Sequence, residues 1–331
     1  MDSFTQIVLG IATAELCAGD KLQRKTFLYG AILGTIPDLD VVVGQFLNPV
    51  EGISIHRGLS HSLLFFILLS PILGWIITKI ERGKIDFRRA SLMVFWSLLT
   101  HVLLDLFTSW GTQIFWPLPD RIAFKTIFVI DPLYTIPLLI FIILAWCKPT
   151  FTIRKKYVLR GIYISSLYLL LTCGLKLYAV QQFTKALEQQ QISYDNLIVK
   201  PTVFNCILWN ANVATKDAYL LGDYSLFDRQ PIRFERYEKN TVLAQELTGN
   251  LDFETLKKVS EGWFIITQKD NLYYFNDLRF GLLSTDSKQP QFAFSYVFKD
   301  ENGTLKAQEV PKQKRDGKAL MKGIFHRIQG N

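Results

Sequence analysis

Three short motifs in the first third of the chain carry side chains that can hold a metal ion. They are Gly34-Thr-Ile-Pro-Asp-Leu-Asp40, His56-Arg-Gly-Leu-Ser-His61 and His101-Val-Leu-Leu-Asp105. Imidazole combined with carboxylate suits Zn²⁺, Mn²⁺ or Fe²⁺ better than Ca²⁺. The candidate metal ligands are therefore Asp38, Asp40, His56, His61, His101 and Asp105.

The spacing within the motifs favours convergence. His101 and Asp105 are four residues apart, so on a helix they project from one face and can hold one ion. Asp38 and Asp40 follow Pro37, and in such a kinked stretch both carboxylates can point the same way. The two histidines of the middle motif flank a turn into the next apolar segment.

Each motif taken alone also has an ordinary structural explanation. A His–Asp pair at helical spacing can be a hydrogen bond, Pro-Asp-x-Asp can be a turn that caps a helix, and His-Arg-x-x-Ser-His can be a polar loop. An ionisable group at the centre of a membrane helix costs about 2.5–3.5 kcal/mol, so a whole set of them is expected to have a function. Six ligands exceed the needs of one tetrahedral ion. We expect one to three divalent ions, with zinc preferred and manganese or iron as alternatives.

Two further residues are candidates for a catalytic role. Arg57 suits a bidentate contact with phosphate or with a developing oxyanion, and a salt bridge to one of the aspartates is the alternative. Asp131 precedes Pro132, so it is either a helix N-cap or a ligand or general base. Gln6 and Gln113 are candidates to line the same site.

The motifs lie in the more apolar half of the chain. The sequence of 331 residues is 49% hydrophobic, and its apolar residues fall in dense runs up to about residue 180. A membrane-spanning helix needs ~20 apolar residues. We interpret six runs as membrane segments: Phe4–Ala18, Phe27–Leu47, Ser62–Ile80, Ala90–Thr108, Pro132–Cys147 and Gly161–Val180. Pro37 and two aspartates interrupt the second run, which predicts a short helix followed by a re-entrant stretch.

Basic residues predict the orientation of these segments. Lys and Arg cluster after the first segment, between the third and fourth, and before the sixth. The positive-inside rule places these loops in the cytoplasm. The three motifs and the tail then lie on the extracytoplasmic side of a multi-pass protein. The same clustering accounts for the net charge of +8, so we expect no nucleic-acid partner.

The tail has a different pattern, with short β-rich runs separated by turn residues. We expect a polytopic helical membrane domain over residues 1–180 and a soluble α+β domain with an antiparallel sheet over residues 181–331. The end, Lys312–Asn331, is basic and is expected to be loose. The predicted strands are Val203–Val213, Tyr219–Tyr224, Ile232–Tyr237, Trp263–Gln268, Leu272–Phe275 and Phe292–Phe298, and the predicted helices are Val180–Gln190 and Thr241–Ser260.

At these motifs the chain resembles the YdjM-like bacterial inner-membrane proteins, which are described as membrane-bound metal-dependent hydrolases. The resemblance covers nearly the whole chain and implies an inner-membrane location and a metal-dependent hydrolase activity. It rests on the three motifs above and on Met1-Asp-Ser-Phe-Thr-Gln6, Trp110-Gly-Thr-Gln-Ile-Phe-Trp-Pro117, Ile130-Asp-Pro-Leu-Tyr-Thr135, Pro201-Thr-Val-Phe-Asn-Cys-Ile-Leu-Trp209 and Asp277-Leu-Arg-Phe-Gly281.

More remotely, the pattern is similar to the zinc-dependent phospholipase C and P1 nuclease group. That similarity implies zinc ligands at Asp38 or Asp40, at His56 or His61, and at the His101–Asp105 pair. The group has further His and Glu ligands on later helices, whereas here no histidine follows His101 until His326. Its N-terminal residue also binds metal, and the nearest candidates in this chain are Asp2 and Gln6.

The expected function is hydrolysis of a phosphoester, such as one carried by a lipid, by metal-activated water at the extracytoplasmic membrane face. Membrane lipids are the expected partners. A second hypothesis is a non-catalytic membrane protein with a structural or sensory metal and a partner-binding tail. A metal transporter is a third, and it is disfavoured because the ionisable residues lie at helix ends rather than at the bilayer midplane.

Overall fold

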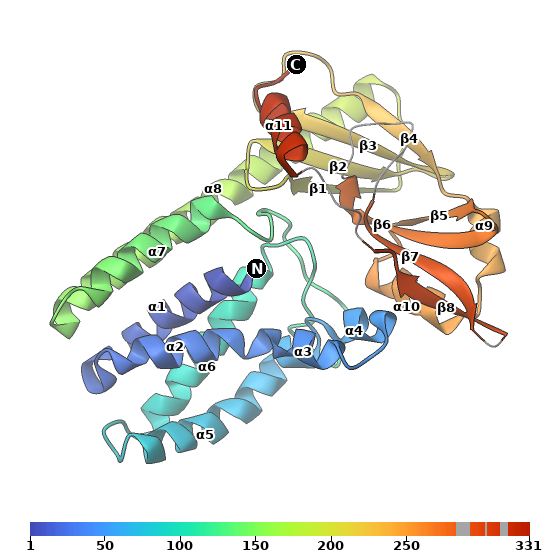
Figure 1. The fold of residues 1–331 in the computed structure, drawn as a ribbon. Helices are drawn as coiled ribbons and strands as arrows, with labels where there is room; N and C mark the ends of the chain where they lie inside the picture. Colours follow the sequence, from blue (N-terminus) through green and yellow to red (C-terminus); the bar gives the residue numbers. More distant parts are fainter. Residues whose placement is uncertain (283–291, 302, 312–316) are drawn as a thin grey trace. The chain divides into compact units, whose positions relative to one another are not determined.

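The computed structural model describes residues 1–282, 292–301, 303–311 and 317–331 (Figure 1). The chain forms two compact units. The first comprises Met1–Val43 and Ile55–Gly174, and the second comprises Gly44–Ser54 and Leu175–Asn331. The predicted boundary between residues 180 and 181 stays a prediction, because the units divide within a long helix and the second unit also takes a short segment from the first half of the chain.

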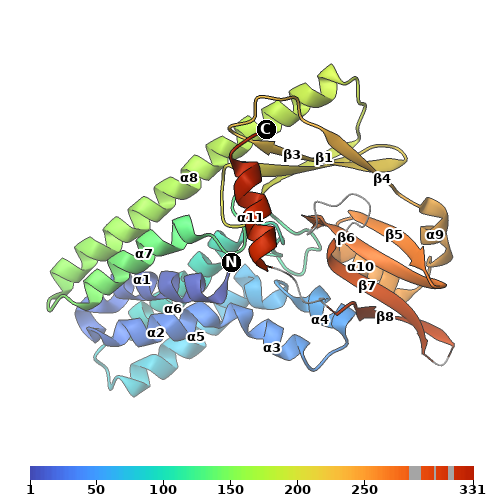
Figure 2. The ribbon, with the colours of Figure 1, turned by 45° about the horizontal axis from the view of Figure 1, so that its top comes forward.

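The first unit is a bundle of helices. Short turns join α1 to α2, α5 to α6 and α7 to α8, whereas a long irregular segment connects α6 with α7. In two views α7 runs alongside the first part of α8 (Figures 1 and 2). Its helices are α1 (Ser3–Leu22), α2 (Lys25–Thr35), α3 (Asp40–Gly44), α5 (Leu63–Ile80), α6 (Phe87–Asp105), α7 (Pro132–Trp146) and the first part of α8 (Phe151–Gln189), with the short 3₁₀ turns η1 (Pro37–Leu39) and η2 (Leu59–His61).

Side-chain caps set where several of these helices begin. Asp2 accepts a hydrogen bond from the Thr5 amide at 3.0 Å and so caps α1. Ser62 accepts one from the Phe65 amide at 3.1 Å at the start of α5. A capping side chain satisfies an amide at the helix start that has no partner within the helix. The helix that follows Ser62 therefore starts directly after the middle motif.

Glycines allow α1 and α2 to pack backbone against backbone. A Cβ added at Gly10 would lie 2.3 Å from the Gly30 carbonyl oxygen, and one at Gly34 would lie 2.5 Å from the Gln6 carbonyl oxygen. Small residues permit this close approach of membrane helices. The contact brings the end of α2, where the first motif begins, against the first turns of α1.

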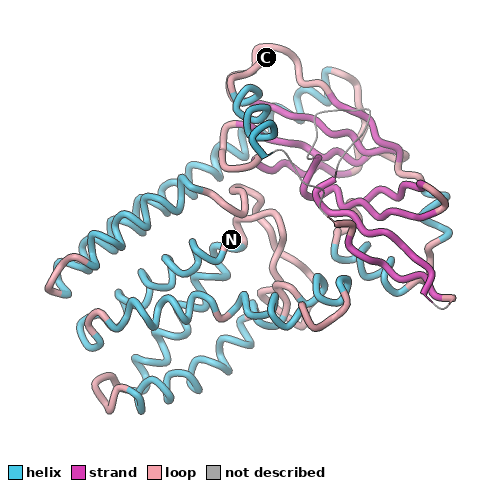
Figure 3. Tube along the Cα trace, in the orientation of Figure 1, coloured by secondary structure: helices cyan, strands magenta, loops and turns pink. Residues whose placement is uncertain are grey.

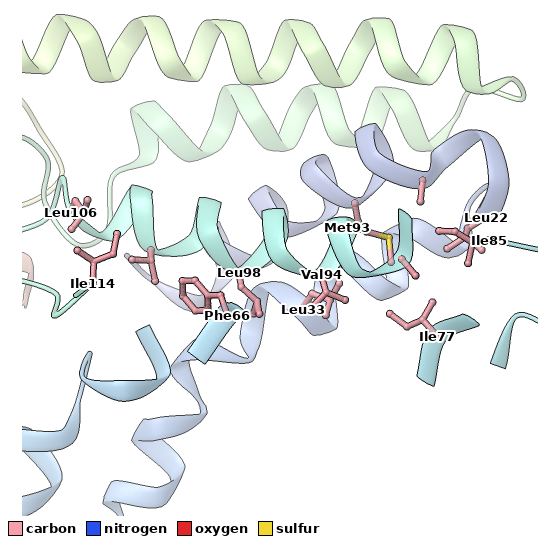
Figure 4. Packing of buried hydrophobic residues seen from close by; sticks show 14 residues of the cluster. Leu22, Leu33, Phe66, Ile77, Ile85, Met93, Val94, Leu98, Leu106 and Ile114 are labelled. Atoms are coloured by element: carbon pink, nitrogen blue, oxygen red, sulfur yellow. The ribbon is translucent and has the colours of Figure 1, made fainter. Parts of the chain in front are cut away.

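The core between α1, α2, α5 and α6 is apolar along its length (Figure 4). Phe66, Leu98 and Val94 are fully buried in it, and Leu22 and Ile85 close it at one end. Apolar side chains on facing helices thus hold α6 in place. The last turns of α6 carry the third motif.

By length and composition, two helices among the described residues can cross a membrane: Leu63–Ile80 and Phe151–Gln189. A third span results if α2 and the segment Pro37–Gly44, which are bent by 45° relative to each other, act as one. The bend falls at Pro37, where the sequence predicts the interruption. The helix Pro132–Trp146 is apolar but shorter. The six-segment, multi-pass topology stays a prediction.

The second unit contains two antiparallel sheets, drawn as magenta strands in Figure 3. One has the strand order β1-β2-β3-β4 and packs against the last turns of α8, where Phe183 and Leu187 are fully buried. The other has the order β5-β6-β7-β8 and packs against α10 through Phe253 and Leu256.

The strands of the first sheet are β1 (Asn196–Pro201), β2 (Leu208–Ala214), β3 (Ala218–Ser225) and β4 (Phe234–Glu238). Those of the second are β5 (Phe264–Lys269), β6 (Leu272–Leu282), β7 (Phe292–Glu301) and β8 (Thr304–Glu309). The described residues of this unit also form the helices α4 (Pro49–Ile55), α9 (Thr241–Glu246), α10 (Leu251–Val259) and α11 (Gly317–Ile328).

The antiparallel α+β character of the tail is confirmed, but the details differ from the sequence prediction. The structure has two sheets rather than one, and the sequence analysis missed β1 and β8. The predicted helix Thr241–Ser260 is broken into α9 and α10, because Asn250 caps a new helix by accepting a hydrogen bond from the Phe253 amide at 3.0 Å. The end of the chain was wrongly predicted to be loose, since Gly317–Ile328 forms helix α11. Residues 312–316 of that prediction lie outside the described residues.

Candidate metal centre

Four of the six predicted ligands converge at one end of the first unit. Asp38 comes from η1, His61 from η2, and His101 and Asp105 from the last turns of α6. One ligand atom from each residue lies within 4.8 Å of all the others. The group therefore joins three segments that are far apart in the sequence.

The four nitrogen–oxygen distances between the ligand atoms fit a single tetrahedral ion. His61 Nε2 lies 3.5 Å from Asp38 Oδ1 and 3.4 Å from Asp105 Oδ2. His101 Nε2 lies 3.5 Å and 3.6 Å from the same two oxygens. An ion with bonds of about 2.1 Å in tetrahedral geometry has its ligand atoms about 3.4 Å apart. Both imidazole Nε2 atoms and Asp105 Oδ2 are buried without a hydrogen-bond partner, which buried polar atoms rarely are.

His101 presents a lone pair to this centre. Its Nδ1 lies 2.8 Å from the carbonyl oxygen of Gly34. A carbonyl oxygen only accepts hydrogen bonds, so Nδ1 carries a proton, and in the neutral ring Nε2 is then the unprotonated nitrogen. Such a contact to the second nitrogen is how proteins fix the tautomer of a metal-binding histidine.

Asp40 orients His61 from behind. Ser60 Oγ donates to Asp40 Oδ2 at 2.9 Å and lies 2.9 Å from His61 Nδ1. The Arg57 amide also donates to Asp40 Oδ2 at 2.9 Å, and His56 Nδ1 lies 3.1 Å from Asp40 Oδ1. Asp40 thus holds the turn that contains the middle motif through hydrogen bonds, and His61 Nε2 lies toward the other three candidate ligands.

The second oxygen of Asp105 is held by a separate set of donors. Arg57 Nη2 and Gln6 Nε2 each donate to Asp105 Oδ1 at 3.0 Å, and the Met1 amino group also contacts this oxygen. Arg57 Nη1 donates to Thr108 Oγ1 at 2.8 Å. These contacts fix the rotation of the carboxylate so that Oδ2 lies toward His61 and His101.

The centre is buried except at Asp38. His61 and Asp105 are fully buried and His101 is 1% exposed, whereas the side chain of Asp38 is 13% exposed. Burial by itself lowers the pKa of His61, but the carboxylates of Asp105, Asp38 and Asp40 outweigh it and raise the pKa to about 9. The carboxylates therefore favour positive charge among them, which a divalent cation also supplies.

The sequence profile of the YdjM inner membrane protein family matches residues 1–183, and this segment contains all four converging residues. The chain belongs to this family. Membership supports a location in the inner membrane.

The chain is also similar to two curated proteins. The Bacillus subtilis (strain 168) protein YfhP, described as uncharacterized, is 25% identical over 236 residues, which cover 67% of this chain and 68% of YfhP. The Escherichia coli (strain K12) inner membrane protein YbcI is 34% identical over 117 residues, which cover 34% of this chain and 66% of YbcI. No solved structure matches the chain.

The remaining predicted site residues of this YdjM family member lie outside the four-residue group. Asp40 and His56 pair with each other beside it. Arg57 forms the salt bridge to an aspartate that the sequence analysis gave as its alternative role, and the partner is Asp105. Its catalytic role stays a prediction. Asp131 caps α7 by accepting from the Leu133 amide at 3.0 Å and also accepts from the Tyr168 hydroxyl at 2.9 Å. Burial raises the pKa of the Asp131 carboxyl.

The other residues that the sequence analysis considered have local roles. Gln6 is fully buried against Asp105, as described above. The backbone amide of Gln113 donates a hydrogen bond to the Arg57 carbonyl at 3.0 Å, and this bond helps to hold the turn that contains the middle motif. Asp2 caps α1. The assignment of ligands and catalytic residues stays a prediction until it is tested with metal.

Besides the Met1 amino group, which contacts Asp105, sequence reasoning missed three supporting residues: Gly34, Ser60 and Thr108. Gly34 and Ser60 lie inside the first and middle motifs, and this position in the sequence was the only sign that they support the site. Thr108 follows Asp105 by three residues, one helical turn, and its hydroxyl donates back to the Asp105 carbonyl at 2.8 Å. None of the three has a side chain that binds divalent metal readily, and each acts on a ligand through a hydrogen bond.

Proposed function

We propose that this protein is a membrane-bound, metal-dependent hydrolase that cleaves a phosphoester at the extracytoplasmic membrane face. The observation that carries the proposal is the convergence of two imidazole nitrogens and two carboxylate oxygens within 4.8 Å of one another. The four nitrogen–oxygen distances are 3.4–3.6 Å, and three of these atoms are buried and lack a hydrogen-bond partner. A bound cation satisfies all of them at once, because both nitrogens and both oxygens can act as electron-pair donors toward it.

Asp38, His61, His101 and Asp105 would hold the ion, and Zn²⁺ fits this donor set best, with Mn²⁺ or Fe²⁺ as alternatives. A metal bound there supplies Lewis acidity and lowers the pKa of a coordinated water to near neutrality. Asp40 and Arg57 act as positioning residues, since each holds a ligand-bearing segment through hydrogen bonds. Asp40 and His56 supply a second His–carboxylate pair beside the first, which supports more than one ion.

Access to the centre is expected from the side of Asp38. This carboxylate is the only one of the four ligand side chains with a sizeable exposed fraction, at 13%. Its Oδ2 accepts a hydrogen bond from Ser3 Oγ at 3.3 Å, so this oxygen faces a polar surface at the start of α1. Water and substrate would approach there, near the helix ends. A substrate that resides in or at the bilayer, such as a phospholipid or a lipid-linked phosphoester, fits this position.

One observation favours a second candidate, a structural or sensory metal site. Four protein ligands complete a tetrahedron, and structural zinc sites are closed in this way, whereas catalytic sites keep one position for water. Three of the four ligand residues are also buried. In this alternative the metal stabilises the first unit, and the second unit binds a partner.

Metal analysis followed by a hydrolysis screen tests the proposal. Purified full-length protein is compared with His101→Ala and with the control His326→Ala, which removes an exposed histidine of the second unit. We expect wild type and control to contain at least one equivalent of divalent metal and to hydrolyse a phosphodiester or phospholipid, while His101→Ala loses both. Metal-free wild-type protein would overturn the metal site. Metal retention without hydrolysis of any phosphoester would favour the structural alternative.

A further inference from the structure

A cavity of about 410 Å³ lies at the end of the first unit opposite the metal centre. It is formed by the turn between α1 and α2, the turn between α5 and α6, and the turn between α7 and α8. These three turns lie together at one end of the bundle, away from α3 (Figure 1). A volume of this size is in the range of small-molecule sites.

The lining of the cavity is strongly basic. Of its nine lining residues five are basic and one is acidic. The acidic residue, Glu81, is already paired: it accepts from Lys25 Nζ at 2.9 and 2.8 Å and from the Tyr29 hydroxyl at 2.7 Å. In the part of the chain that the structure describes, no carboxylate lies within ion-pair distance of the other three flexible basic residues, Lys21, Arg24 and Lys84. The cavity thus has an excess of positive charge.

A buried arginine makes one wall of the cavity rigid. Arg154 is 1% exposed, and its Nε donates to Glu15 Oε1 at 2.7 Å. Its Nη2 donates to the Gly19 carbonyl at 3.0 Å and to Gln23 Oε1 at 3.2 Å, and its Nη1 donates to the Pro149 carbonyl at 3.3 Å. These bonds connect the end of α1 with the turn before α8. The hydrogen bonds of Arg154 therefore fix the position of the α1–α2 turn relative to the α7–α8 turn.

Exposed apolar side chains lie in the first turn of α2 and at the ends of α5 and α7, next to the turns that form the cavity. Leu28 is 63%, Ile80 61% and Trp146 48% exposed. The guanidinium carbon of Arg24 lies 5.6 Å from the centre of the Trp146 ring, which is a cation–π contact. Tryptophan is enriched where membrane proteins meet the headgroup layer. The basic cavity thus lies where apolar helix surfaces give way to polar turns.

We propose that this cavity binds the phosphate of an anionic phospholipid headgroup. Lys21, Arg24 and Lys84 would neutralise the phosphate, and the acyl chains would lie along the exposed apolar faces of α2 and α5. Basic pockets between membrane helices on the cytoplasmic side bind anionic lipids in this way. Inorganic phosphate has the same charge chemistry but no acyl chains, so only a lipid uses both the basic lining and the apolar rim. The site is separate from the metal centre and does not depend on its activity.

Native mass spectrometry of the full-length protein in detergent tests this proposal, with phosphatidylglycerol, phosphatidylcholine and inorganic phosphate as probes. The test variant is Lys21→Gln/Arg24→Gln/Lys84→Gln. The matched control is Arg88→Gln/Lys155→Gln/Lys156→Gln, which removes the same charge from exposed residues that do not line the cavity. We expect phosphatidylglycerol affinity to fall about tenfold or more in the test variant, because each basic residue near an anionic lipid contributes measurably. The control should change it less than threefold, and phosphatidylcholine binding should be weak throughout.

Three outcomes would overturn the proposal. Equal losses in test and control variants would show a diffuse charge effect rather than a site. Equal affinity for phosphatidylglycerol and phosphatidylcholine would show no role for the basic lining. Competition by inorganic phosphate alone, with no preference for lipid, would make this a site for soluble phosphate. If the triple variant does not fold, the single variant Lys84→Gln is used, and it should weaken phosphatidylglycerol binding about threefold.

Discussion

Arg57 donates a hydrogen bond from Nη2 to Oδ1 of Asp105 at 3.0 Å, and the other oxygen of Asp105 lies 3.4 Å from His61 Nε2. The Arg57 side chain is 3% exposed, and its guanidinium also donates a hydrogen bond to Thr108 Oγ1. Asp105 Oδ1 is therefore occupied by hydrogen bonds from the protein, whereas Oδ2 is available to bind an ion. We therefore expect Arg57 to act on the candidate metal centre through Asp105.

Arg57→Ala is expected to weaken metal binding about 10–100-fold, the usual effect of losing a hydrogen-bond partner of a ligand. Arg57→Lys should recover only part of the affinity, because an ammonium group cannot reach Asp105 and Thr108 with a planar fork. Metal affinity is measured by competition with a chelator, with exposed Arg88→Ala as the control. Unchanged affinity combined with reduced hydrolysis would instead place Arg57 in contact with substrate.

The two aspartates of the first motif should differ in a measurable way. Asp38→Asn removes a ligand charge, so we expect the metal content of the purified protein to fall to background. Asp40→Asn replaces one accepting oxygen with an amide that cannot accept from Ser60 or Arg57, so we expect a loss in affinity of about 10–100-fold. Elemental analysis and chelator competition measure the two effects. Equal loss of metal in both variants would make Asp40 a ligand as well.

The contact between α1 and α2 predicts that Gly34→Ala destabilises the protein and the site together. The new methyl group would lie 2.5 Å from the Gln6 carbonyl oxygen. We expect a loss of about 1–3 kcal/mol in the free energy of unfolding, the usual cost of overpacking, and weaker metal binding because the carbonyl that orients His101 moves. Gly174→Ala is the control, since a Cβ there meets no atom within 4 Å. Normal stability of Gly34→Ala in detergent unfolding would refute the close packing.

The buried ion pair between Glu15 and Arg154 predicts strong coupling. Removing one partner, as in Glu15→Gln or Arg154→Met, is expected to cost about 3–5 kcal/mol, because the other charge stays buried without its partner. The double variant should cost less than the sum of the two. Titration with a denaturing detergent measures all three. The exposed pair of Arg236 and Glu238 is the control, and its removal should hardly change the unfolding midpoint. Additive costs would show that the pair does not interact.

The orientation of the helices is also open to a direct test. Single cysteines between Trp110 and Arg121, or beyond Lys200, should react with a membrane-impermeant reagent applied to intact cells, and cysteines between Arg82 and Arg88 should not. The reverse pattern would place the metal centre on the cytoplasmic side. The lipid site would then face outward.

The motifs predicted where in the chain the candidate metal centre lies, but not which of the six candidate ligands converge. Helical spacing correctly brings His101 and Asp105 to one face, because both lie on one regular helix. Spacing could not separate Asp38 from Asp40, since which carboxylate turns inward depends on contacts with the turn from Arg57 to His61. The partner of Arg57 lies 48 residues away, and such long-range pairs leave no local signal. In the tail, β1 ends in Pro201 and β8 is largely polar, so neither has the pattern of a typical strand.

The four converging side chains belong to three segments, η1, η2 and α6, so an ion bound there would act as a crosslink. Binding to the folded state alone stabilises that state, by about 4 kcal/mol when free metal is a thousandfold above its dissociation constant. The resistance of the helical unit to unfolding would then follow the concentration of free metal around it. A cell short of that metal would carry a less durable form of the protein, whichever reaction the site serves.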